Sequence, residues 1–114
     1  MDIVVLKFGG TSVCDEKTRY EAFKHIRREV NAGYRVVVVV SAMGRVGAPY
    51  ATDTLKSLVA YHLSKKESDR LISCGEVISS IVMSDFLQQE GLKACALAPN
   101  EVGIKTDRNF SNAN

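Results

Sequence analysis

The sequence predicts an α/β fold built around a mainly parallel sheet. Two apolar runs rich in branched residues, Ile3 to Leu6 and Val36 to Val40, are typical of strands buried on both faces. An amphipathic stretch lies between them, and the order strand, helix, strand indicates a parallel βαβ unit. The 114 residues, 46% of them apolar and 25% charged, are enough for one globular domain with a core.

The first strand runs into a loop rich in glycine and hydroxyl residues. Ligands bind at the carboxyl edge of parallel sheets, where this loop should emerge. Gly9 and Gly10 allow a sharp turn in which backbone N–H groups approach a phosphate. Thr11 and Ser12 add hydroxyl donors, and Lys7 adds a point charge. The alternative is a plain Gly-Gly turn with a solvated lysine, and neither the Walker A nor the Rossmann glycine pattern is present.

A helix is predicted next, with Asp15 as its N-cap and a stop at Asn31-Ala32-Gly33. Its apolar residues at helical spacing are Tyr20, Phe23, Ile26 and Val30. His25 lies among charged neighbours, so we expect it on the surface rather than in a site. Arg35 then opens the valine run, which reads as a central, fully buried parallel strand.

The second strand ends at Ser41-Ala42-Met43-Gly44, and a further helix should begin at Thr52. Two strand ends therefore deliver Gly, Ser and Thr residues to the same sheet edge. Ser41 is alternatively a simple turn residue. Thr52 is alternatively a helix N-cap, a role that it could combine with ligand binding.

A long helix is predicted from the capping box Ser64 to Glu67 as far as Gly91. Gly75 lies inside it and marks a kink or a point of close approach, because glycine is unfavourable in a helix interior. Glu76 is the single carboxylate between Leu71 and Met83, and composition alone favours an exposed glutamate.

A short third strand is predicted over Lys93 to Ala98, followed by a loop, Glu101 to Asp107, that could return to the ligand edge. The formal charge of +2 is too small to suggest nucleic acid or an anionic membrane as a partner. Three widely spaced cysteines without a C-x-x-C pair argue against disulfides or a zinc site. The first residues lack the basic and long apolar regions of a signal peptide, so we expect none, and no apolar run is long enough to span a bilayer. We therefore expect a cytoplasmic protein, and we also expect no protein-bound metal.

The order of these motifs resembles that of the aspartate kinases, in the amino acid kinase family. The segments that carry the resemblance, in chain order, are Lys7 to Val13, Val39 to Gly44, Thr52 to Leu55, Ser73 to Glu76, and Gly103 to Asp107. They cover the whole chain, and KFGGTSV followed by SCGE at this distance is a specific signature. The form SAMGR with PYATDT is similar to the aspartokinases of Gram-positive bacteria.

The resemblance implies a three-layer αβα sandwich around a mainly parallel sheet. It implies transfer of the γ-phosphoryl group of Mg-ATP to the side-chain carboxylate of L-aspartate, giving 4-phospho-L-aspartate. In the family this is the first step of lysine, threonine, methionine and diaminopimelate biosynthesis. The residues implied to hold the ATP phosphates are Lys7, Gly9, Gly10, Thr11, Ser12 and Ser41, with Lys7 catalytic. Thr52 and Glu76 would hold the amino acid, with Glu76 paired to its ammonium.

The family's kinase domain is longer than this chain. Residues 1–114 are therefore expected to be the amino-terminal portion of such a domain, without its carboxyl-terminal nucleotide-binding half or the regulatory domains. Alone, the chain should be inactive, and it should self-associate or pair with the missing part. Two alternatives remain: a stand-alone anion-binding or interaction module, and a flavodoxin-like or Rossmann-type cofactor binder, which lacks the required glycine spacing.

Overall fold

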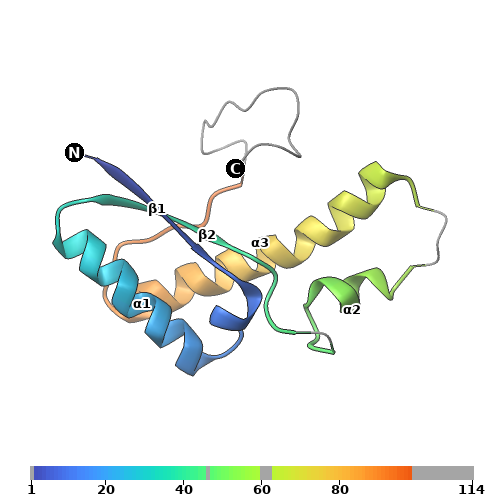
Figure 1. Cartoon of the computed structure of the whole chain (residues 1–114), viewed down its shortest axis with the longest axis horizontal. Coiled ribbons are helices and arrows are strands. Elements are labelled where there is room, and N and C mark those ends of the chain that lie inside the picture. Colours follow the sequence, from blue (N-terminus) through green and yellow to red (C-terminus); the bar gives the residue numbers. More distant parts are fainter. Residues whose placement is uncertain (1, 46, 60–62, 99–114) are drawn as a thin grey trace.

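The computed structural model describes residues 2–45, 47–59 and 63–98 (Figure 1). The elements are strand β1 (Ile3–Phe8), a short 3-10 helix η1 (Gly10–Ser12), helix α1 (Glu16–Asn31), strand β2 (Arg35–Val40), and helices α2 (Thr52–Lys56) and α3 (Lys65–Gln89). The predicted strand, helix, strand order is therefore confirmed, although β1 continues two residues further than the apolar run suggested.

Strands β1 and β2 pair in parallel, which confirms the predicted βαβ unit. Their register runs from Ile3 opposite Arg35 to Phe8 opposite Val40. Because the strands end side by side, the loops that follow them start from the same edge of the sheet. This edge holds the loops for which a ligand was predicted.

Helix α1 begins as the sequence predicted. The Asp15 carboxylate accepts from the Thr18 backbone N–H at 2.8 Å, and the Thr18 hydroxyl oxygen accepts from the Asp15 N–H at 3.1 Å. These two bonds form a reciprocal capping box. The bond from the Thr18 backbone N–H favours the ionised carboxylate, and hydrogen bonding from Thr18 lowers the pKa of Asp15. The helix ends at Asn31, and Gly33 has φ +95°, a value that suits glycine after a helix.

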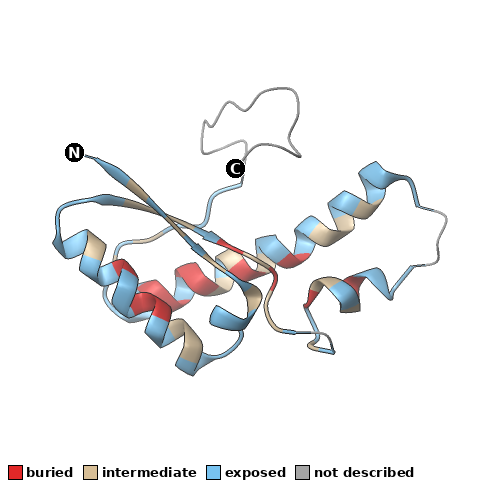
Figure 2. Ribbon diagram, in the orientation of Figure 1, coloured by how far each residue is buried: buried red, intermediate tan, exposed pale blue. Residues whose placement is uncertain are grey.

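The core lies on one face of the two-stranded sheet. Alternate strand residues point to this face, and both α1 and α3 pack against it, as the buried positions in Figure 2 show. The buried residues of the cluster are Val13, Ala22, Phe23, Ile26, Val40, Met83, Phe86 and Leu87, and the strand residues that pack on them include Leu6, Phe8, Val36 and Val38.

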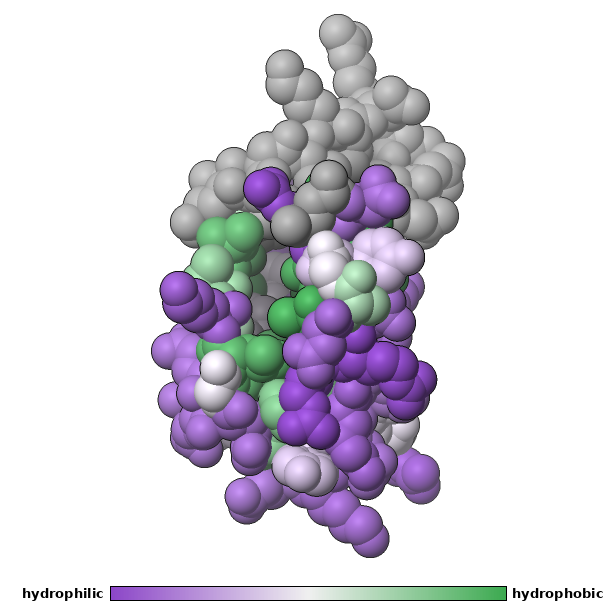
Figure 3. Space-filling view, turned by 90° about the vertical axis from the view of Figure 1, so that its left-hand side faces the viewer, coloured by the Kyte–Doolittle hydropathy of each residue, from purple (hydrophilic) through white to green (hydrophobic). Residues whose placement is uncertain are grey.

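The opposite face of the sheet is open to solvent in the described part of the chain. Ile3 and Val5 are each 63% exposed, and Val39 is 42% exposed. The prediction that both strands are buried on both faces is therefore wrong here, because helices cover one side only. Seen from the end where the strands begin, a band of hydrophobic surface lies between hydrophilic flanks (Figure 3). The described residues form two of the three expected layers.

Helix α3 is continuous from Lys65 to Gln89. The Ser64 hydroxyl caps it by accepting from the Glu67 N–H at 3.2 Å, as predicted. Gly91, with φ +93°, follows its end. By length and composition alone, α3 could cross a membrane, with a mean hydropathy of 1.3 over an 18-residue window. This is weak support for a span, since core helices of soluble proteins share these properties, and α3 packs against α1, α2 and β2.

The predicted third strand is wrong. Residues 92–98 have no regular secondary structure. Leu92 and Ala94 pack against the core, and the Gln88 side-chain amide donates to the Ala94 carbonyl at 3.1 Å. A short apolar run becomes a strand only where a neighbouring strand can pair with it, and β1 and β2 are the only strands in the ranges described. The predicted loop at 101–107 lies outside the described residues.

Candidate functional site

The first loop turns immediately after β1 and is anchored by a buried valine. The Ser12 N–H donates to the Gly9 carbonyl at 3.0 Å, and the Val13 N–H donates to the Gly10 carbonyl at 3.4 Å. Val13 is 1% exposed, so its side chain fixes the end of the loop in the core. Gly9 has φ −73° and ψ 170°, which any residue can adopt. The sharp turn therefore does not depend on the conformational freedom of Gly9, contrary to the sequence-based expectation.

The second loop, Ser41 to Gly44, is hydrogen bonded directly to the first. The Ser41 N–H donates to the Phe8 carbonyl, and the Gly44 N–H donates to the Gly10 carbonyl, each at 3.1 Å. Gly44 has φ +94°, the left-handed conformation that side chains rarely adopt. The two loops thus form one unit at the carboxyl edge of the sheet, as predicted.

The two glycines of the first loop have different reasons to be glycine. A Cβ on Gly10 would collide with the Ala42 carbonyl oxygen and lie 2.9 Å from the Gly44 carbonyl oxygen. Gly10 is therefore required by the packing of loop against loop. A Cβ on Gly9 would meet no atom within 4 Å. The space over Gly9 is open, so a bound anion could approach the backbone there.

Helix α3 lies in close contact with the second loop at Gly75. A Cβ on this residue would lie 2.9 Å from the Ala42 Cβ, 2.9 Å from the Leu55 Cδ1 and 3.0 Å from the Tyr50 carbonyl oxygen. Of the two readings of Gly75, the structure supports close approach, and α3 is one continuous helix through this residue. The contact fixes α3 against the second loop and α2, and Glu76 is the next, exposed residue of the helix.

Glu76 is exposed and carries no hydrogen bond or ion pair within the described ranges. An exposed, unpartnered carboxylate is ordinary in water. Here it can also accept a ligand ammonium without first breaking an internal ion pair.

Thr52 is the first residue of α2 and is half-buried. Its predicted capping role is wrong, because Ala51 occupies the N-cap position and no side chain caps this helix. In a five-residue helix beside α3, packing of the buried Ala51 and Leu55 fixes the start instead. The Thr52 hydroxyl is thereby left without an internal partner in the part of the chain described.

Lys7 lies within β1 rather than in the loop. It is opposite Val39 in the register and belongs to the set of strand residues facing away from the core. Its side chain is exposed, and among the described residues it forms no ion pair. Lys7 therefore lies on the uncovered face of the sheet, two residues before Gly9 in the sequence.

The hydroxyls of Thr11, Ser12 and Ser41 have no hydrogen-bond partner within residues 2–45, 47–59 and 63–98. Elsewhere the structure uses hydroxyls locally, since Ser73 and Ser80 each donate to the carbonyl three residues earlier, at 2.7 and 2.8 Å. The loop hydroxyls are thus free to donate to a ligand.

The structure joins the two loops directly, and the packing at Gly75 joins α3 to the second loop and to α2. No hydrogen bond or ion pair in the described part links Lys7, Thr52 and Glu76 to one another. Sequence reasoning missed Ala42, whose small side chain admits Gly75. The small residues of the second loop could have indicated a close contact there, but they do not identify Gly75 as the partner.

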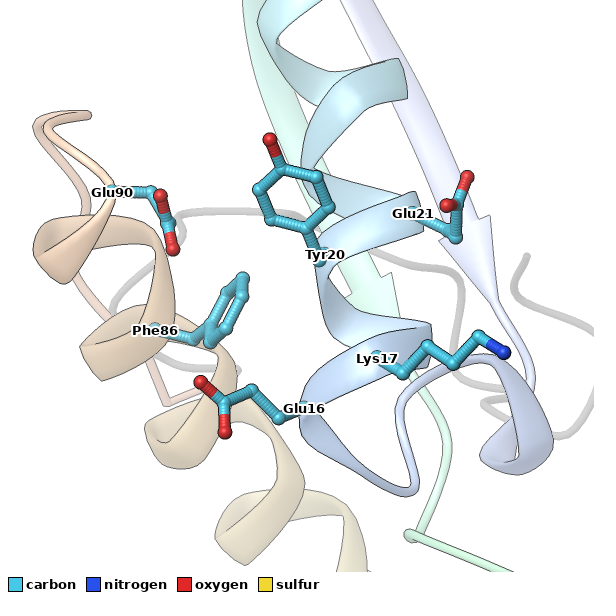
Figure 4. A pocket seen from close by; sticks show the side chains of 6 residues that line it. All are labelled: Glu16, Lys17, Tyr20, Glu21, Phe86 and Glu90. Atoms are coloured by element: carbon cyan, nitrogen blue, oxygen red, sulfur yellow. The ribbon is translucent and has the colours of Figure 1, made fainter.

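A separate surface groove of about 450 Å³ lies between α1 and α3. Its lining residues are Glu16, Lys17, Tyr20, Glu21, Phe86 and Glu90. The rings of Tyr20 and Phe86 face the space between the helices, whereas Lys17 and Glu21 point away from it (Figure 4). The groove contains none of the predicted site residues and is not part of the loop site.

Comparisons with known proteins show the family of this chain. Residues 2–114 match the model of the amino acid kinase family. The chain is 50% identical to aspartokinase 1 of Bacillus subtilis, over 99% of this chain and 29% of that protein. It is 40% identical to the aspartokinase of Geobacillus stearothermophilus, over 99% of this chain and 27% of that protein.

A crystal structure of aspartate kinase from Synechocystis superposes with a TM-score of 0.67 and 37% identity, covering 78% of this chain and 15% of that one. The chain spans less than a third of the length of these curated relatives.

Proposed function

Because the chain belongs to the amino acid kinase family, we propose that it is the amino-terminal portion of an aspartate kinase domain. In the parent protein it would help to transfer the γ-phosphoryl group of Mg-ATP to the side-chain carboxylate of L-aspartate, giving 4-phospho-L-aspartate. The observation that carries the proposal is the joined pair of loops, with open space over Gly9 and with hydroxyls on Thr11, Ser12 and Ser41 that have no hydrogen-bond partner in the described residues.

The arrangement suits phosphoryl transfer in particular. A carboxylate oxygen of aspartate forms a bond to the γ-phosphorus as the bond from phosphorus to the oxygen of ADP breaks. Neither the nucleophile nor the leaving group needs to gain or lose a proton, so the site needs no general base. It needs positioning and stabilisation of negative charge, which Lys7, loop N–H groups and loop hydroxyls can supply.

Mg²⁺ fits this site as part of the nucleotide complex. In the described ranges no three His, Cys, Asp or Glu side chains gather in one place. Magnesium often keeps several waters and binds through substrate phosphates rather than through a cage of protein ligands. The ion would supply charge neutralisation on the phosphates, while the residues of this chain orient the phosphate oxygens.

Thr52 and Glu76 would bind the amino acid on the side of the second loop. The Glu76 carboxylate carries the charge needed to pair with an α-ammonium group, and the Thr52 hydroxyl can donate to a substrate oxygen. Holding aspartate at its ammonium end would leave its side-chain carboxylate directed toward the loops for in-line attack. The close packing at Gly75 would keep both residues at a fixed distance from the loops.

The uncovered face of the sheet would be covered in the parent protein by the remainder of its kinase domain. Ile3, Val5 and Val39 leave an apolar surface exposed here, and both strands have an unpaired edge within the described residues. The chain on its own would self-associate through this surface. We place the reaction in the cytoplasm, which agrees with three free, exposed cysteines.

The proposal is tested by measuring hydroxamate formation from Mg-ATP, hydroxylamine and L-aspartate with the full-length parent protein. We expect product with aspartate and little with glutamate, whose carboxylate lies one methylene further from its ammonium. Nucleotide binding without product from any amino acid would contradict the proposal and favour an anion-binding module.

A further inference from the structure

Arg19 connects helix α1 to both loops of the candidate site. Its Nη1 donates to the Val13 carbonyl, at the end of the first loop, at 3.0 Å. The same nitrogen lies 3.9 Å from the Met43 Sδ, in the second loop. Val13 is fully buried, and Arg19 is half-buried beneath it. One guanidinium thus contacts the two segments that are also joined by the bond from Gly44 to Gly10.

The charge of Arg19 has no carboxylate partner of its own. The single ion pair within 4.0 Å in the described ranges joins Lys24 to Glu21. The Nε of Arg19 is buried without a hydrogen-bond partner. Asp15 lies one turn earlier, and Arg19 is only the smallest of several causes that lower the pKa of its carboxyl.

The other neighbour of the guanidinium is an aromatic ring. The Arg19 Cζ lies 5.9 Å from the centre of the Phe86 ring, on α3. A ring and one carbonyl offset only part of the cost of withdrawing a cation from water. A hydrophobic residue would fill this position at lower cost, so the charge requires a reason beyond packing.

We propose that Arg19 is a positioning residue for the phosphate cradle, which holds the ends of both loops in register and places a fixed positive charge behind them. The inference rests on the proposed function, because the bound phosphates would be the counter-charge that the fold itself lacks. Arg19 acts through Val13 and Met43 and does not touch the ligand. Its loss would therefore weaken nucleotide binding selectively, while aspartate binding, which depends on Thr52 and Glu76, would be spared.

The test compares Arg19→Met with Arg27→Met in the full-length parent protein. Arg27 is a matched control, since it lies on the same helix with its Cζ 5.0 Å from the Phe23 ring centre, but it contacts neither loop. For Arg19→Met we expect the KM and the equilibrium Kd for Mg-ATP to rise about ten-fold or more, as for the loss of a charged hydrogen bond. The KM for aspartate should change less than about two-fold, which corresponds to well under 1 kcal/mol.

The conservative variant Arg19→Lys separates charge from shape. It keeps the positive charge and loses the planar fork, so it should restore part of the Mg-ATP affinity that Arg19→Met loses. Equal loss of affinity for both substrates, or an Mg-ATP affinity like that of Arg27→Met, would overturn the inference. If the wild-type protein binds Mg-ATP but phosphorylates no aspartate, the proposed function fails, while the Kd series still decides the role of Arg19.

Discussion

The contrast between Gly9 and Gly10 makes a sharp prediction, because adjacent glycines should respond oppositely to the same change. Gly10→Ala places a methyl group against the Ala42 and Gly44 carbonyl oxygens. Such overpacking costs about 1–3 kcal/mol. Parting the loops would also weaken the hydrogen bond from Gly44 to Gly10, worth about 1 kcal/mol. We therefore expect Gly10→Ala to destabilise the parent protein by about 2–4 kcal/mol.

Gly9→Ala should leave folding intact. The backbone of Gly9 is already in a region open to alanine, and the new Cβ meets no atom within 4 Å. Restricting the unfolded chain should even stabilise the protein, by about 0.4–1 kcal/mol. If phosphate occupies the open space, however, the methyl group will obstruct it, and Mg-ATP affinity should fall about ten-fold or more, equal to a loss of about 1.4 kcal/mol.

The assay pairs thermal unfolding of both variants at equal protein concentration with calorimetric titration of Mg-ATP. A loss of 1 kcal/mol lowers the melting temperature of a domain of about 150–250 residues by about 2–4 °C, so the predicted difference is measurable. Unchanged nucleotide affinity in Gly9→Ala would refute the reasoning about the open space. Wild-type stability in Gly10→Ala would refute the reasoning about loop contact.

Three further predictions concern single side chains. Lys7→Met should reduce the turnover number about 10- to 150-fold, as expected for the loss of about 1.5–3 kcal/mol of charged hydrogen bonding. The aspartate KM should change little. An unchanged turnover number in steady-state kinetics would contradict the catalytic role of Lys7. Glu76→Gln should raise the aspartate KM and spare Mg-ATP binding, whereas equal loss for both substrates would indicate a structural residue. Asp15→Ala should lower the urea midpoint at pH 7. The pKa of Asp15 is lowered in the folded protein, so its contribution is present above its ordinary pKa of about 3.9 and is lost as pH falls through the folded value. The two midpoints should therefore converge as the pH falls below about 3.9, and a constant difference would argue against the capping account.

The local features of this fold could be predicted from sequence because nearby residues determine them. Asp15 and Ser64 cap their helices through partners three residues away, so the signal lies within one turn. The apolar runs likewise identified both strands, and their order around a helix implied parallel pairing. The predictions that were wrong concern features that depend on contacts between residues far apart in the sequence.

A valine run looks the same whether one or both faces of a sheet are covered, so sequence could not show that Val39 is 42% exposed here. The run at Lys93 to Ala98 has strand character, but pairing depends on a neighbour that the described residues do not offer. From the sequence, Gly75 could mark either a kink in the helix or a point of close approach to another segment. Its packing on Ala42, more than thirty positions earlier in the printed sequence, decided between them.

The candidate site was predictable in its residue types and much less in its arrangement. The resemblance named Gly9, Gly10 and Ser41 as candidates, and the order of the strands predicted that their loops would share one edge of the sheet, which the hydrogen bonds between the loops confirm. The positions of Thr52 and Glu76 depend on how α2 and α3 pack against the second loop, which no local pattern specifies. Arg19 escaped notice because a lone arginine on an amphipathic helix reads as a solvated charge.

The most direct test of the account is a complementation assay with the 114-residue chain. Hydroxamate formation from Mg-ATP and L-aspartate is measured with the chain alone, with the remainder of the parent protein alone, and with the two mixed. The account predicts no product from either part and product on mixing, because the chain supplies a phosphate cradle and an ammonium partner that act only with the other half. Robust activity from the chain alone would contradict it.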